Sequence, residues 1–211
     1  MKGKDEMYGL TVYFPQRKYC YAHEGLGRGG YHFEKCQVCG RNIAHPLPPT
    51  GEEGYILEGG KQFPDFLGYG GGGIYFIISD RMLNAFGENG VTGFDKAVEV
   101  PVYRKYRREL IRQDAVYYSV NITGSIDFDL KAMALKKKNR CPSCGQFDWS
   151  RQRLYLIKTV FDMNTWDGSD LCRIDSFPGH IVCTEKVKGV IEKYRFAGAE
   201  LRAEDRIFCI S

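Results

Sequence analysis

The chain has 211 residues, of which 43% are apolar and 27% are charged, and its formal net charge is +4. This mix is typical of a globular protein. The longest apolar run, at 74–78, is far shorter than the roughly 20 residues of a membrane helix, and the N-terminal residues have no apolar stretch of signal-peptide length. We therefore expect a cytoplasmic protein with no membrane partner. Its eight cysteines should be reduced or metal-bound rather than paired as disulfides.

The first part of the chain combines strand signals with a stretch rich in glycine and proline. Residues 1–34 alternate loosely between apolar and polar side chains, which predicts one or two strands. Residues 41–73 are rich in Gly and Pro and predict an irregular covering loop. The glycine run at 68–73 lacks the residue order of a phosphate-binding loop, so we expect no nucleotide there.

The pattern becomes sharper after residue 73. Residues 73–80 read as a buried strand that ends at Ser79 and Asp80, two residues that can cap the start of a helix. The helix is predicted over 81–87, and Gly90 suits the position just beyond its C-terminus. This stretch therefore predicts a strand followed directly by a short helix.

A second stretch near the C-terminus has the same order of features. A strand that opens at His180 ends at Cys183 and Thr184, which precede another helical segment. The phrases that close the two helices, 91–95 and 196–200, also correspond, with one extra residue in the second copy. We predict an α+β fold with a mixed sheet built on a duplicated strand–helix–strand unit, in which the two copies pack around a common sheet.

The motif Cys-x-x-Cys-Gly occurs twice, at 36–40 and 141–145. Two residues between the thiols let both sulfurs reach one side of a tight turn, and the glycine permits a positive φ. One motif supplies two ligands, whereas a structural zinc site takes four in a tetrahedron. The repetition predicts a zinc-ribbon-like module with one structural Zn²⁺, about 2.3 Å from each sulfur, held by Cys36, Cys39, Cys141 and Cys144.

Other interpretations of the cysteines stay open. A redox Cys-x-x-Cys is expected as a single motif that opens a helix after a strand, whereas here there are two motifs. His32 and His45 flank the first motif, and either could replace one cysteine as a ligand. The remaining cysteines lack this spacing and are expected to pack in the core: Cys20, Cys172, Cys183 and Cys209.

Positive charge is concentrated in residues 101–140, which hold ten Lys or Arg and four acidic residues. A basic segment beside a zinc site is compatible with nucleic-acid binding through phosphate contacts. The sequence pI of 8.5 is lower than the value of about 9 that is typical of nucleic-acid-binding domains, so a solvated surface is the preferred interpretation. Four residues are expected to be mostly exposed and to make no obligatory nucleic-acid contact: Arg104, Lys105, Arg107 and Arg108.

Acidic residues gather around Trp166, at positions 162, 167, 170 and 175. Paired carboxylates can serve acid–base chemistry or bind a metal, but the ligand order of a calcium loop is absent and Asp-Gly is a strong turn signal. No histidine stands at a recognised catalytic spacing, so we do not expect an enzyme. An aromatic anchor ringed by acids would suit recognition of a cationic protein, which predicts these partner contacts: Asp162, Trp166, Asp167 and Asp170.

The two cysteine motifs, the segment 77–95 and the segment 166–186 together resemble the double-CXXCG motif family. The resemblance covers about residues 31 to 208. The family includes immunity proteins of bacterial swarming-inhibition toxin pairs, and the C-terminal half is also similar to a wider group of polymorphic-toxin immunity proteins. The resemblance implies a small cytosolic protein, not an enzyme, that neutralises a cognate toxin encoded by an adjacent gene.

Four segments follow from these patterns: N-terminal strands with the first knuckle and the Gly/Pro-rich loop (1–66), a first α/β unit (67–135), the second knuckle joining the first (136–156) and a second α/β unit (157–211). Three functions compete. The preferred one is a toxin-binding immunity protein with structural zinc. The alternatives are a zinc-ribbon nucleic-acid-binding protein that uses the basic segment, and a hydrolase with an acidic site near 162–175.

Overall fold

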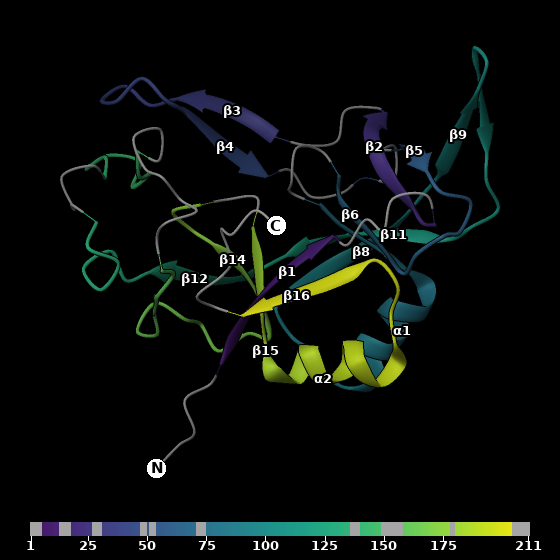
Figure 1. The fold of residues 1–211 in the computed structure, drawn as a ribbon. Coiled ribbons are helices and arrows are strands. Elements are labelled where there is room, and N and C mark those ends of the chain that lie inside the picture. Colours follow the sequence, from purple (N-terminus) through teal and green to yellow (C-terminus); the bar gives the residue numbers. More distant parts are fainter. Residues whose placement is uncertain are drawn as a thin grey trace.

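The computed structural model describes residues 6–12, 18–26, 31–46, 50, 54–70, 75–135, 140–148, 158–177 and 180–203. These residues form a mixed α+β fold in which strands predominate, together with two helices that lie side by side under the sheets (Figure 1). Neither helix is long and apolar enough to cross a membrane.

A four-stranded sheet carries the first helix. Its strand order is β6-β7-β11-β8, with every neighbouring pair antiparallel. Helix α1 (Asp80–Glu88) follows β7 directly, and its N-cap is Ser79, whose Oγ accepts a hydrogen bond from the backbone N of Met82. The strands are β6 (Phe66–Gly70), β7 (Tyr75–Ser79), β8 (Phe94–Val100) and β11 (Tyr117–Ile122).

A six-stranded sheet carries the second helix. Its strand order is β13-β12-β14-β15-β1-β16, and it is antiparallel except for the β12–β14 pair. Helix α2 (Glu185–Tyr194) follows β15, with Thr184 at its N-cap. The strands are β1 (Met7–Val12), β12 (Gly124–Phe128), β13 (Phe161–Asp162), β14 (Leu171–Ile174), β15 (Ile181–Thr184) and β16 (Ala199–Ala203).

Two further sheets complete the described part of the fold. One has the order β10-β9-β5-β2, and the other is the β3–β4 hairpin. Figure 1 shows β9 and the β3–β4 hairpin projecting on opposite sides of the molecule. The strands are β2 (Cys20–Leu26), β3 (Tyr31–Lys35), β4 (Asn42–Pro46), β5 (Gly54–Gly59), β9 (Val102–Tyr106) and β10 (Glu109–Arg112).

Several predicted elements are confirmed and one is wrong. Strand β7 and helix α1 lie where the segment 73–87 predicted them, and Gly90 follows the helix with φ +60°. The predicted irregular loop at 41–73 instead contains β4, β5 and β6. Its apolar side chains, such as Tyr55 and Phe66, are buried, and this burial outweighs the low strand propensity of the surrounding glycines.

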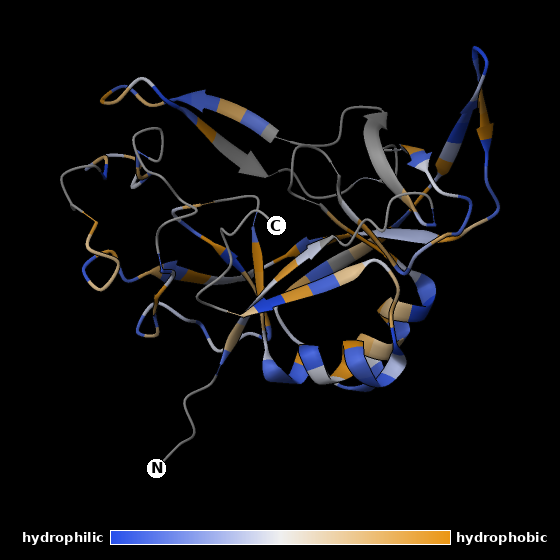
Figure 2. Ribbon diagram, viewed as in Figure 1, coloured by the Kyte–Doolittle hydropathy of each residue, from blue (hydrophilic) through white to orange (hydrophobic). Residues whose placement is uncertain are grey.

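The two helices share a core, but they do not share one sheet as predicted. Strands β7 and β8 lie in the four-stranded sheet, and β15 and β16 lie in the six-stranded sheet. The apolar faces of both helices enter one cluster of buried side chains that includes residues of both sheets, and Figure 2 shows apolar residues alternating with polar ones along both helices. A short helix buries only one face, so each helix is covered best where its apolar face meets the other helix and two sheets.

Buried positions in this shared core recur at a spacing of 105 residues. The recurrence starts in β6 and β14, continues through both strand–helix junctions and ends after the helices. The buried pairs are Phe66 and Leu171, Phe76 and Ile181, Ile78 and Cys183, Met82 and Val187, Ala85 and Val190, Phe86 and Ile191, and Val91 and Phe196.

The same spacing corrects the predicted match between the two helical stretches. The N-cap residues are Ser79 and Thr184, which are themselves 105 residues apart. The glycines that follow the helices, Gly93 and Gly198, keep the same spacing, with φ of +91° and +86°. The second stretch therefore has no extra residue. The predicted match was off by one because it aligned Ser79 with Cys183, the residue before the cap Thr184.

Candidate metal centre

The β3–β4 hairpin positions the first pair of cysteines in the turn that joins its strands. In this first cysteine turn (36–41), the backbone N of Cys36 donates to the carbonyl of Arg41 at 2.9 Å, and the N of Gly40 donates to the carbonyl of Cys36 at 2.9 Å. Gly40 has φ +70°, a conformation that a residue with a side chain rarely adopts. The turn is thus fixed by its own backbone before any ligand is considered.

The second cysteine turn (141–146) has the same construction. The N of Cys141 donates to the carbonyl of Gln146 at 2.9 Å, and the N of Gly145 donates to the carbonyl of Cys141 at 3.0 Å. Gly145 has φ +71°, and a β-bridge joins Arg140 to Phe147 across the base of the turn. The repeated sequence motif therefore folds into a repeated local structure.

The two turns face each other, and their four thiols converge. Cys36 Sγ lies 3.8 Å from Cys141 Sγ, and Cys39 Sγ lies 3.7 Å from Cys144 Sγ. All four sulfurs lie within 4.8 Å of one another. Four sulfurs placed tetrahedrally at about 2.3 Å from a metal would be about 3.8 Å apart, whereas a disulfide needs about 2.05 Å. The geometry is that of four separate thiols that could bind one metal ion.

His32 stays outside this group, whereas the side chain of His45 lies outside the described residues. Among the described residues, the metal-competent group consists of the four cysteines alone. His32 and His45 are register partners on β3 and β4, so they lie on the strands of the hairpin rather than in its turn.

Backbone N–H groups act on the first thiol of each turn. Those of Cys39 and Val38 lower the pKa of Cys36 to about 6. Those of Cys144 and Ser143 likewise lower the pKa of Cys141. The N–H of Gln146 acts in the same direction on Cys144, but burial and the three neighbouring sulfurs outweigh it and raise the pKa of Cys144 to about 11. The turns therefore favour a thiolate at their first cysteine, which is the form that ligates metals.

Arg41 binds the two turns to each other, and Arg140 closes the base of the second turn. Arg41 Nη2 lies 3.1 Å from a carboxylate oxygen of Asp148, and Arg41 Nη1 donates to the carbonyl of Gln146 at 3.3 Å. Arg140 Nε donates to the carbonyl of Gly145 at 2.7 Å. These bonds satisfy two carbonyls of the second turn with charged donors, which form stronger hydrogen bonds than neutral ones.

A buried carboxylate anchors the second turn to the six-stranded sheet. Arg140 Nη2 lies 2.9 Å from Asp127 Oδ2, and Asp127 is only 4% exposed. The other oxygen of Asp127 accepts hydrogen bonds from the hydroxyl and the backbone N of Ser176. Sequence reasoning missed Arg41, Arg140 and Asp127. A usable signal was that Arg41 directly follows the first motif and Arg140 directly precedes the second.

The predicted acidic partner surface has internal roles in the fold. Asp162 accepts hydrogen bonds from the backbone and side chain of Asn164, and Asp167 accepts from the backbone of Ser125 and Ser169. Asp170 takes part in a larger network at the start of α2. The indole of Trp166 is half-buried against the core and donates to the carbonyl of Ser169. Their role as partner contacts stays a prediction.

Residues 102–112 of the basic segment form the β9–β10 hairpin, and the exposure predicted for four of them is confirmed for three. Lys105, Arg107 and Arg108 are exposed. Arg104 departs from the prediction because it is half-buried, donates to the carbonyl of Gly60 at 2.7 Å and lies over the ring of Phe63.

Comparison with models of known protein families finds no match for this chain, and comparison with curated proteins finds none either. The resemblance to the double-CXXCG family therefore rests on the motifs quoted above.

Proposed function

We propose that this chain is an immunity protein that binds and neutralises a toxin, and that one structural Zn²⁺ holds its two cysteine turns together. The observation that carries the metal is the spacing of 3.7–3.8 Å between sulfurs from opposite turns. The resemblance of the motifs to immunity proteins supports the toxin partner. Zn²⁺ is favoured because a mononuclear site of four thiolates in a tetrahedron suits its coordination.

The chemistry of a four-cysteine site supports a structural role. Four thiolates fill the tetrahedron, so a bound Zn²⁺ would keep no open position for a reacting water, unlike a catalytic zinc. Cys36, Cys39, Cys141 and Cys144 would supply all the ligands. The net charge of four thiolates and one Zn²⁺ is about −2, and Arg41 and Arg140 are placed to offset it.

The position of the site supports a role in holding distant segments together. Cys36 and Cys141 are 105 residues apart, and the two turns belong to the β3–β4 hairpin and to the segment anchored on Asp127. A metal that cross-links such distant positions removes much of the conformational freedom of the unfolded chain. The ion would thus stabilise the molecule that presents the toxin-binding surface.

We further propose that the chain is a tandem duplication. Both cysteine turns, both helices and the buried pairs of the shared core repeat at 105 residues. The strand order β6-β7-β11-β8 corresponds to β14-β15-β1-β16. In this correspondence β1, from the first copy, lies in the sheet of the second copy, and β11, from the second copy, lies in the sheet of the first. Each copy would thus contribute one exchanged strand and half of the zinc-ribbon-like site.

The test is co-expression with the toxin encoded by the adjacent gene, in a host that this toxin alone kills. We expect survival in the presence of the intact protein, with a stoichiometric complex of nanomolar or tighter affinity, about −12 kcal/mol. Death of the host for every neighbouring toxin tried, with a folded and metal-loaded protein present, would refute the immunity function.

A further inference from the structure

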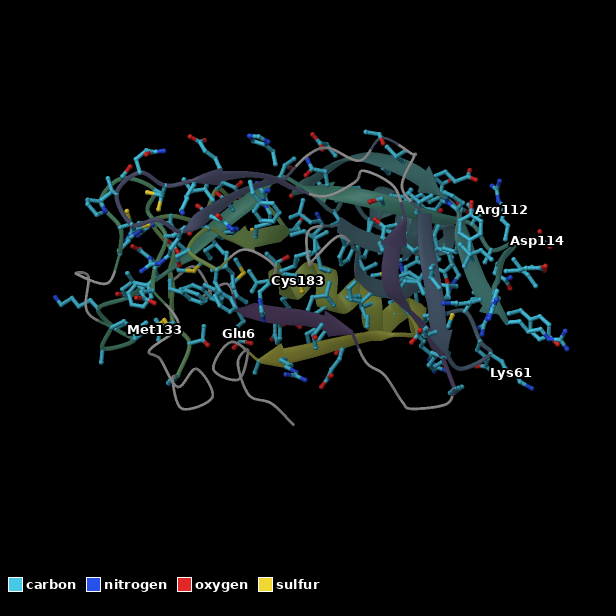
Figure 3. All side chains as sticks on the ribbon, turned by 90° about the horizontal axis from the view of Figure 1, so that it is seen from above. Glu6, Lys61, Arg112, Asp114, Met133 and Cys183 are labelled. Carbon is cyan, nitrogen blue, oxygen red and sulfur yellow. The ribbon has the colours of Figure 1, made fainter. Side chains whose placement is uncertain are left out.

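The β9–β10 hairpin (102–112) connects the two proposed copies in the chain. It follows β8, the last strand of the first copy, and precedes β11, the first strand of the second copy. It projects from the molecule on the side opposite the β3–β4 hairpin (Figure 1). Figure 3 shows Arg112, its last strand residue, at the opposite end of the molecule from Met133, which packs in the same buried cluster as Phe147 of the second cysteine-turn segment. The hairpin is thus far from the proposed metal.

The hairpin is an exposed edge with apolar side chains. Strand β10 is at the edge of its sheet, and all four of its residues are exposed. Tyr106 is 60% exposed, Leu110 43% and Ile111 47%. Large apolar side chains gathered at one exposed edge are typical of protein-binding surfaces, and natural edge strands usually avoid them.

The same hairpin is strongly basic. It holds five basic residues and one acidic residue, Glu109. Within the described part of the chain, Lys105 and Arg108 form no ion pair, whereas Arg104 anchors the hairpin base to Gly60. A free cationic rim around exposed apolar residues is complementary to an acidic protein surface with an apolar centre.

We propose that the β9–β10 hairpin is the surface through which this protein docks on an acidic face of the toxin. This rests on the proposed immunity function. We favour a protein over a nucleic acid because phosphate binding gives Leu110 and Ile111 nothing to contact. We favour the hairpin over the acidic segment 162–170 because the carboxylates of that segment already accept hydrogen bonds within the molecule.

Two pairs of substitutions in the full-length protein test the hairpin. Lys105→Glu with Arg108→Glu reverses two free charges, and Leu110→Ser with Ile111→Ser removes the apolar contact. Lys131→Glu with Lys193→Glu is the matched charge control, because both residues are exposed and lie outside the hairpin and outside the segment 162–170. Exposed positions of this kind change stability little, and circular dichroism with metal analysis checks that each variant is folded and loaded.

The readouts are binding of the purified toxin and survival of the toxin-producing host. We expect each hairpin variant to bind the toxin at least about 100-fold more weakly and to lose protection, while the control behaves as wild type. Wild-type binding of the toxin by folded hairpin variants would refute the hairpin as the docking surface and leave the immunity function intact. A wild-type protein that neither binds nor protects would overturn both. Salt-sensitive binding of duplex DNA or RNA probes that the charge reversal abolishes, with toxin binding unchanged, would assign the hairpin to nucleic acid instead.

Discussion

Asp65 and Asp170 occupy the same place in the first half (6–100) and the second half (117–203) of the molecule. Each backbone carbonyl accepts from the N-cap residue of the following helix, Ser79 at 2.7 Å and Thr184 at 3.0 Å. Each carboxylate also accepts from that N-cap hydroxyl. In addition, each receives a backbone N–H from the turn after the other half's helix: Ala197 N donates to Asp65, and Thr92 N donates to Asp170.

The basic partner of each carboxylate differs. Arg81 reaches Asp65 with Nε at 2.9 Å and Nη2 at 2.6 Å, whereas Lys186 reaches Asp170 with its single Nζ at 2.9 Å. Ser79 also caps α1 through the N of Met82, whereas Thr184 makes no side-chain cap bond to α2. The backbone plan is thus common to both halves, while the side chains differ. At Asp170 the hydroxyl of Thr92 donates to the carboxylate at 3.0 Å, whereas at Asp65 a second nitrogen of Arg81 does so.

The largest expected effect concerns the two cysteine turns. If each half supplies half of the metal site, Cys36→Ser with Cys39→Ser should act like Cys141→Ser with Cys144→Ser. Either pair should abolish metal binding and lower the free energy of unfolding by about 4 kcal/mol, the size expected when a cross-link closing a loop of about 100 residues is lost. Elemental analysis and urea denaturation measure both quantities. Cys20→Ser is the control for metal content alone, since Cys20 lies outside the cluster but is buried in the core. Unequal metal loss in the two pairs would contradict the equivalence of the halves.

The next effect concerns the glycines after the two helices. A Cβ on Gly93 would lie 2.1 Å from the carbonyl of Leu171, and a Cβ on Gly198 would lie 2.4 Å from the carbonyl of Phe66. Alanine at either site should therefore lower the free energy of unfolding by roughly 3 kcal/mol, because the strain of a positive φ adds to the clash with a backbone carbonyl. Gly168→Ala, with φ +87° and open space, should cost about 1 kcal/mol. Thermal and urea unfolding measure the loss of stability. A much smaller loss at only one of the two glycines would contradict the equivalence of the halves.

The carboxylates themselves give a smaller and unequal effect. Asp65→Ala leaves a bidentate arginine and a backbone N–H without their acceptor, so it should lower the free energy of unfolding by about 3 kcal/mol. Asp170→Ala should lower it by about 2 kcal/mol, since the single ammonium group of Lys186 can turn to water. Both figures allow for basic partners that are about half-exposed, at 55% and 44%. Urea titration of the two variants and wild type gives the ranking. A larger loss of unfolding free energy for Asp170→Ala than for Asp65→Ala would contradict the expected ranking.

The smallest effect is a pH dependence confined to the second half. His180 lies directly before β15, where the first half has Tyr75. Burial, with help from Arg202, lowers the pKa of His180 below 6.5. The unfolded chain therefore binds a proton first, so this residue costs stability as the pH falls below about 6.5, by at most about 1.4 kcal/mol per pH unit. His180→Phe keeps a ring against Phe177 and should flatten this slope between pH 7 and 5; an unchanged slope would rule His180 out as its source.

Local sequence signals predicted what depends on neighbouring residues. The spacing within each cysteine motif and the capping residue Ser79 both led to the right element, because a turn or a helix start is fixed by a few consecutive residues. The convergence of the two motifs was predictable only because four ligands are needed at one metal.

The features that sequence reasoning missed depend on residues far apart in the chain. The placement of β1 beside β15 and β16, and of β11 between β7 and β8, depends on which apolar faces meet in the folded core. The pairing of Asp127 with Arg140 likewise joins β12 to the residue directly before the second cysteine turn. No local pattern of residues predicts such contacts.

X-ray absorption spectroscopy at the zinc edge, with metal content measured on the same purified sample, tests the four-cysteine site most directly. We predict one Zn²⁺ per chain with four sulfur neighbours at about 2.3 Å and no nitrogen in the first coordination shell. A metal-free folded protein would contradict the proposed centre. So would a zinc coordinated by a mixture of sulfur and nitrogen, as expected if His32 or His45 took the place of a cysteine.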